Sequence, residues 1–89
     1  MRSLAFALLA VSVSLPRQAS AEEFEGICAW ALADRGVERK TDCSVNWKDP
    51  ATGKTYCFSN EQTKMLFLQE PEENIQKAEE TFARLRKKQ

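Results

Sequence analysis

Cysteine is the residue type that most constrains this 89-residue chain, because its three cysteines are the main candidates for a stabilising cross-link. They are Cys28, Cys43 and Cys57, and the sequence contains no histidine. A domain this small buries only about 60% of its unfolded surface, so many such domains depend on a disulfide, a metal or a partner. In an oxidising compartment, an odd number of cysteines leaves at least one thiol without a partner in its own chain.

The first 21 residues are typical of a secretory signal. Arg2 precedes an apolar run over residues 4–15, and the small residues of Ala19-Ser20-Ala21 suit a signal peptidase. The run is shorter than the roughly 20 apolar residues that a membrane-spanning helix needs. We therefore expect residues 1–21 to be removed. Residues 22–89 should then form one periplasmic or secreted domain without a membrane span.

Charge and composition argue against nucleic-acid binding and against catalysis. Removal of the signal takes away Arg2 and Arg17 but no acidic residue, so the mature chain is slightly acidic and offers no basic surface for nucleic acid. Without histidine, the chain lacks the usual general base near neutral pH and the commonest metal ligand. It also lacks a Cys-x-x-Cys motif and a glycine-rich phosphate loop. We therefore expect a protein that is not an enzyme.

The mature chain begins with a pattern typical of an amphipathic helix over residues 22–35. Its apolar residues recur at three- and four-residue spacing, and Gly36 is a natural stop. The apolar stripe consists of Phe24, Ile27, Cys28, Ala31 and Leu32. Cys28 is therefore expected to face the core.

A β-hairpin is predicted over residues 41–58, with a turn that contains proline and glycine. We expect Lys48 and Lys54 to face each other across this turn. Side chains alternate with period two, so this register would place Cys43 and Cys57 on the same face of the hairpin. The hairpin would then bring these two thiols close together.

Two helices are predicted after the hairpin. Ser59 is expected to cap the first, with Gln62 completing a capping box, and Pro71 is suited to the first position of the second. The apolar stripe of the second helix consists of Ile75, Ala78, Phe82 and Leu85. The sequence thus predicts an α+β domain with an N-terminal helix, a β-hairpin and two C-terminal helices packed on the hairpin.

A pattern of aromatic and helix-start residues runs through residues 41–75. Its members are Tyr56, Phe58, Ser59, Phe67 and Pro71. The pattern resembles the YHS domain family, which is related to the TRASH-like metal-binding modules, and it implies a hairpin followed by helices. Metal-binding members of that family carry cysteines at the positions that here hold Ser59 and Thr63. A metal site in this chain would therefore have to use its own three cysteines.

Two functions are consistent with these cysteines. Three thiolates without histidine suit copper(I) better than zinc, which usually takes four ligands in a closed site. On this hypothesis Cys28, Cys43 and Cys57 bind copper(I), and the protein traffics or senses the metal together with a metal-handling protein. The alternative is a structural or interaction module without metal, in which Cys43 and Cys57 form a disulfide and Cys28 is a buried small hydrophobe.

We predict that the exported form begins at Glu22, because the small residues of Ala19-Ser20-Ala21 direct cleavage after Ala21. The intact mass of protein exported from a bacterial host should match residues 22–89. A mass equal to that of the whole chain would show that the segment is retained.

Overall fold

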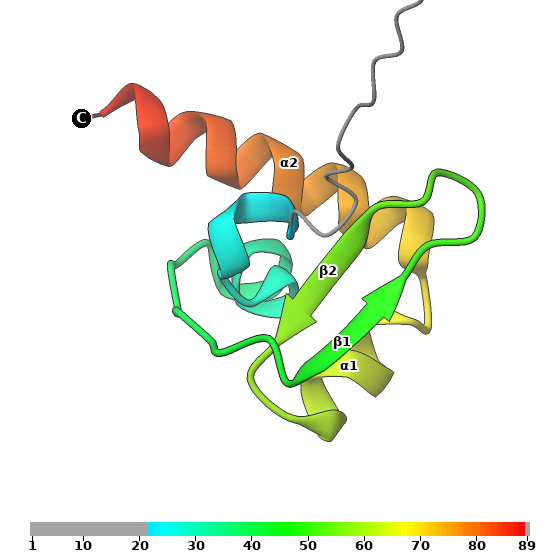
Figure 1. The fold of residues 1–89 in the computed structure, drawn as a ribbon. Coiled ribbons are helices and arrows are strands. Elements are labelled where there is room, and N and C mark those ends of the chain that lie inside the picture. Colours follow the sequence, from blue (N-terminus) through cyan, green and yellow to red (C-terminus); the bar gives the residue numbers. More distant parts are fainter. Residues whose placement is uncertain (1–21, 89) are drawn as a thin grey trace, which may run out of the picture.

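The computed structural model describes residues 22–88, so the predicted signal over residues 1–21 lies outside the described residues. A two-stranded antiparallel hairpin is combined with helices, as the sequence predicted (Figure 1). In chain order, the elements are the 3₁₀ helix η2 (Glu23–Gly26), the π-helix η3 (Ala31–Arg35), β1 (Val45–Lys48), β2 (Thr55–Phe58), α1 (Glu61–Phe67) and α2 (Pro71–Lys87).

The N-terminal segment contains two short helical segments instead of the continuous helix predicted over residues 22–35. Residues 24–26 all have positive φ, between 58° and 82°, and an α-helix cannot continue through that conformation. Ile27 is extended, and helical geometry resumes only after Cys28. Gly36 ends the second segment in a left-handed conformation with a φ of 70°, which confirms it as the stop.

The extended residues Ile27 and Cys28 lie beside the hairpin and add to its hydrogen bonding. Cys28 forms a parallel bridge with Cys57 of β2, and Ile27 forms an antiparallel bridge with Lys40. The Cys28 amide donates to the Arg39 carbonyl at 2.8 Å. Ile27 and Cys28 are at most 1% exposed, as expected for a strand with neighbours on both edges. Part of the apolar stripe predicted over residues 22–35 therefore forms a buried strand and not a helix.

The register of the hairpin differs by one residue from the predicted one. Lys48 pairs with Thr55 and not with Lys54. Lys54 belongs to the turn instead, where its carbonyl accepts the Asp49 amide at 2.8 Å. The buried Asp49 carboxylate also accepts the Ala51 amide at 2.9 Å. Asp49 therefore stabilises the turn through both its backbone and its side chain.

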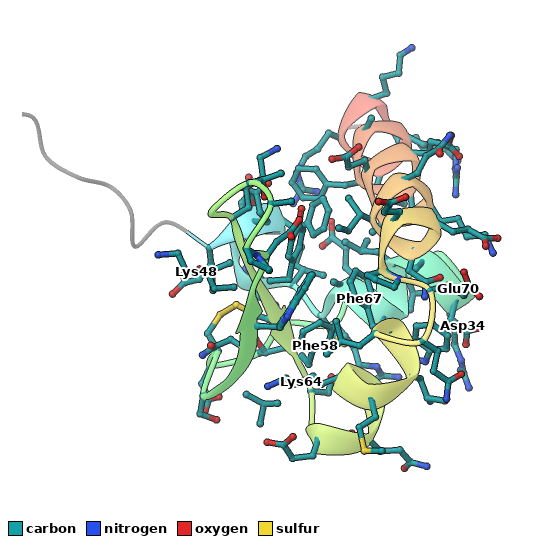
Figure 2. All side chains as sticks on the ribbon, turned by 90° about the vertical axis from the view of Figure 1, so that its right-hand side faces the viewer. Asp34, Lys48, Phe58, Lys64, Phe67 and Glu70 are labelled. Carbon is teal, nitrogen blue, oxygen red and sulfur yellow. A yellow bond between two sulfur atoms is a disulfide. The ribbon has the colours of Figure 1, made fainter. Side chains whose placement is uncertain are left out.

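The aromatic core lies between β2 and the helices. Tyr56 and Phe58 of β2 and Phe67 of α1 are at most 1% exposed. The centroid of the Phe67 ring lies 5.1 Å from that of Phe58 (Figure 2) and 5.9 Å from that of Tyr56. Phe24 joins this cluster to Phe82 of α2, with ring centroids 5.3 Å apart. Aromatic pairs at these distances add specific contacts to the burial of apolar area.

Helix α1 begins one residue later than predicted. Asn60, and not Ser59, is its N-cap, and the Asn60 side chain accepts the Thr63 amide at 2.9 Å. The Thr63 hydroxyl accepts the Asn60 amide at 3.2 Å, which completes a capping box. The predicted box of Ser59 and Gln62 is therefore wrong, whereas Pro71 does occupy the start of α2 as predicted.

Helix α1 packs on the hairpin, whereas α2 packs chiefly against η3 (Figure 1). This corrects the prediction that both C-terminal helices pack on the hairpin. The buried Ala78 lies in the apolar stripe of α2. Near the C-terminal end of α2, Arg86 forms ion pairs with Glu25 and Glu38. Helix α2 thus covers the N-terminal segment.

No helix within residues 22–88 is long and apolar enough to cross a membrane.

We predict that Gly53→Val lowers the melting temperature of the domain. Gly53 has a φ of +80°, as expected for the hairpin turn, and a Cβ there would meet nothing within 4 Å, so the penalty is backbone strain alone. A cost of about 1–2 kcal/mol corresponds to a drop of roughly 4–16 °C in a domain of this size. Ala51→Val in the same exposed turn is the control, because Ala51 does not have positive φ. Equal melting temperatures for the two variants would contradict the strain at Gly53.

Candidate functional site

Cys43 and Cys57 are joined by a disulfide, with their Cα atoms 4.8 Å apart (Figure 2, yellow bond). The observed register places Asn46 opposite Cys57, so the disulfide does not join directly opposed strand residues. Cys43 precedes β1 and has a φ of 62°. This left-handed conformation breaks the strand alternation and lets the Cys43 side chain reach β2. The predicted proximity of the two thiols is therefore correct, although its predicted cause is not.

Thr41 connects the disulfide to the N-terminal segment. Its hydroxyl donates to the Gly26 carbonyl at 2.8 Å and accepts the Cys43 amide at 3.0 Å. The Thr41 oxygen also lies 3.6 Å from Cys43 Sγ. A Cβ on Gly26 would stand 3.5 Å from the same sulfur, so the disulfide packs closely against this glycine. The disulfide therefore holds the N-terminal segment, the start of the hairpin and β2 in one place.

Cys28 is the free cysteine of residues 22–88, and its side chain is 1% exposed. Its backbone pairs with that of Cys57, yet its side chain belongs to the hydrophobic core cluster and lines a pocket that Cys57 does not reach. Among the described residues, no three Cys, Asp or Glu side chains converge as a metal site. The structure thus joins Cys43 to Cys57 and leaves the Cys28 thiol outside the disulfide.

Two opposing effects act on the Cys28 thiol. Burial raises its pKa, but hydrogen bonds from the Ser59 hydroxyl and from backbone amides stabilise the thiolate. These amides belong to Ala31, Ser59 and Trp30, and together the hydrogen bonds outweigh burial and lower the pKa of Cys28. The thiol therefore ionises more readily than an ordinary cysteine, which increases its nucleophilic and soft-ligand character.

A pocket of about 520 Å³ opens beside Cys28. One wall comes from the segment before the hairpin, and the other from helix α1 and the residues that connect it to β2. The lining consists of Cys28, Trp30, Ala31, Asp34, Arg35, Arg39, Ser59, Asn60, Thr63 and Leu66. The sequence did not predict this pocket, because its two walls are distant in the chain and no spacing rule links them. The one available signal was Ser59 and Thr63, which stand where the YHS resemblance expects metal-ligating cysteines.

No protein-family model matches this chain, and no curated protein or solved structure is significantly similar to it.

We predict that Ser59→Ala shifts the ionisation of Cys28 to higher pH. The substitution removes a hydroxyl that stabilises the thiolate, so alkylation of Cys28 by iodoacetamide should require a higher pH than in the parent. Ser44→Ala is the matched control, because the Ser44 hydroxyl bonds to Asp42 and not to Cys28. An unchanged pH profile in Ser59→Ala would contradict the role of this hydroxyl.

Proposed function

We propose that residues 22–89 form a small exported interaction module that is stapled by a disulfide. The observation that supports this function best is the bond between Cys43 and Cys57. Disulfides persist in oxidising compartments outside the cytoplasm and are rare within it. A protein whose fold depends on one is expected to carry an export signal, and the composition of residues 1–21 fits that expectation. The module is then periplasmic or secreted.

The staple matters because a domain of this size buries only a limited core. The two cysteines are 14 residues apart, and closing a loop of this length contributes about 3 kcal/mol in the chain-entropy model. Folded domains have a total stability of about 5–15 kcal/mol. The disulfide therefore contributes a large share of the stability of this module, and reduction should make it markedly easier to unfold.

The chemistry around Cys28 supports binding and not catalysis. A cysteine nucleophile usually works with a neighbouring base, commonly histidine, and the sequence has none. The hydrogen bonds to Cys28 come from a serine hydroxyl and backbone amides, which stabilise a thiolate but cannot accept and return a proton near neutral pH. We therefore propose that the module is not an enzyme.

We also propose that this module is a divergent relative of the YHS family. Its hairpin followed by helices is the architecture that the resemblance implies, and Tyr56, Phe58 and Phe67 form its aromatic core. Ser59 and Thr63, at the positions of the cysteines in metal-binding members, both line the pocket beside Cys28. The location of the pocket thus supports the relationship.

A second candidate function is binding of copper(I) by the reduced protein. The observation that favours it is the backbone pairing of Cys28 with Cys57, which is itself bonded to Cys43, so all three cysteines share one neighbourhood. Reduction would release two thiols next to a third whose pKa is lowered, and copper(I) accepts such soft donors readily. The protein would then traffic or sense copper(I) together with a metal-handling protein, and zinc would fit this set less well.

We predict that the isolated protein, once denatured, contains one reactive thiol, because two of its three cysteines are bonded. Cys43→Ser and Cys57→Ser should each remove about 3 kcal/mol of stability, measured by urea unfolding. Cys28→Ser is the matched control and should cost less, because it leaves the staple intact. Three reactive thiols in protein isolated from an oxidising compartment would contradict the stapled module.

Copper(I) titration of the reduced protein distinguishes the two candidate functions. Binding of about one copper(I) per chain that each single Cys→Ser change weakens sharply would support a three-thiolate site, because serine lacks the soft donor atom. Binding that survives Cys28→Ser would rule that site out and leave the interaction module.

A further inference from the structure

The pocket beside Cys28 has the size and mixed lining of a small-molecule site. Its volume of about 520 Å³ lies within the roughly 300–1,000 Å³ that ligand pockets usually have. Trp30 and Leu66 are half-buried and form apolar parts of its two walls. Such walls can cover the hydrocarbon body of a ligand, while the charged side chains of the lining select its polar group.

The charge of the lining favours an anion. Asp34 is paired with Arg35, with 3.7 Å between carboxylate and guanidinium. Arg39 forms no ion pair with any residue that the structure describes, so its guanidinium is available. The backbone of Arg39 is anchored, because its carbonyl accepts the Cys28 amide at 2.8 Å. A guanidinium on a fixed backbone is well suited to bind a carboxylate through two parallel hydrogen bonds.

The neutral polar groups of the lining are mostly engaged elsewhere. Asn60 and Thr63 bond to each other in the capping box of α1, and the Ser59 hydroxyl lies near the Cys28 thiol, whose pKa it lowers. Arg39 is therefore the principal group that can recognise a ligand's charge. One uncompensated positive charge matches a monoanion better than a dianion.

We propose that this pocket binds a small monocarboxylic acid with an aryl or alkyl body. The carboxylate is held by Arg39, and the hydrocarbon body packs between Trp30 and Leu66. The proposal does not depend on the copper or interaction hypothesis, because it uses neither the disulfide nor the thiol of Cys28.

Trp30 provides a direct readout of binding. The described part of the chain has one other tryptophan, Trp47, which stacks on Tyr56 and does not line the pocket. Trp47→Phe therefore leaves Trp30 fluorescence as the signal. The purified protein, with its disulfide intact, is titrated with phenylacetate and hexanoate, with the amides of both acids, and with phenyl phosphate.

Both acids should quench or shift Trp30 fluorescence saturably, and their amides should bind at least roughly tenfold more weakly, because a charged hydrogen-bonded pair is lost. Arg39→Gln should weaken binding of the acids by a similar factor. Arg84→Gln, the same change at an exposed arginine outside the lining, should leave binding unchanged. Arg39 is also exposed, so equal melting temperatures of the two variants will separate lost binding from lost folding.

Three results would overturn the proposal. The first is the absence of saturable binding by either acid. The second is equal binding of acids and amides, or no effect of Arg39→Gln, since the carboxylate would then not be recognised by this guanidinium. The third is tighter binding of phenyl phosphate than of phenylacetate, which would identify a phosphate site in place of a carboxylate site.

Discussion

The backbone pairing of Ile27 and Cys28 is the interaction on which the rest of this structure depends. These residues lie between β2 and the segment before the hairpin, and they are almost completely buried. Buried backbone groups need hydrogen-bond partners; here the Ile27 amide donates to the Phe24 carbonyl at 3.0 Å and the Cys28 amide to the Arg39 carbonyl at 2.8 Å. Without this strand the hairpin would be a two-stranded ribbon, which is marginally stable by itself in water.

The candidate functional features are built around the same buried strand. The disulfide fixes β2 to the segment before β1, and Thr41 extends that connection to the Gly26 carbonyl. The pocket forms where the chain leaves the strand at Cys28 and faces the start of α1. The disulfide thus strengthens a domain that is too small to bury a large core.

The fold lowers the pKa of Cys28, an effect that the sequence around Cys28 does not predict. A free cysteine in an apolar core normally behaves as a small hydrophobe. Here Ser59 and the backbone amides that surround the sulfur lower its pKa despite burial. Ser59 is 31 positions away in the chain and reaches Cys28 only because β2 pairs with the N-terminal strand.

The sequence by itself determined the features that depend on local chemistry. These are the hairpin and its glycine turn, the stop at Gly36 and the start of α2 at Pro71. Each follows from residues that are near one another in the chain. The tertiary structure alone decided that residues 24–28 leave the helical path, that the register shifts by one, and that a pocket forms beside Cys28. Periodicity could not reveal these features, because a stripe of apolar residues is buried equally well in a helix or in a central strand, and the choice between them depends on partners distant in the chain.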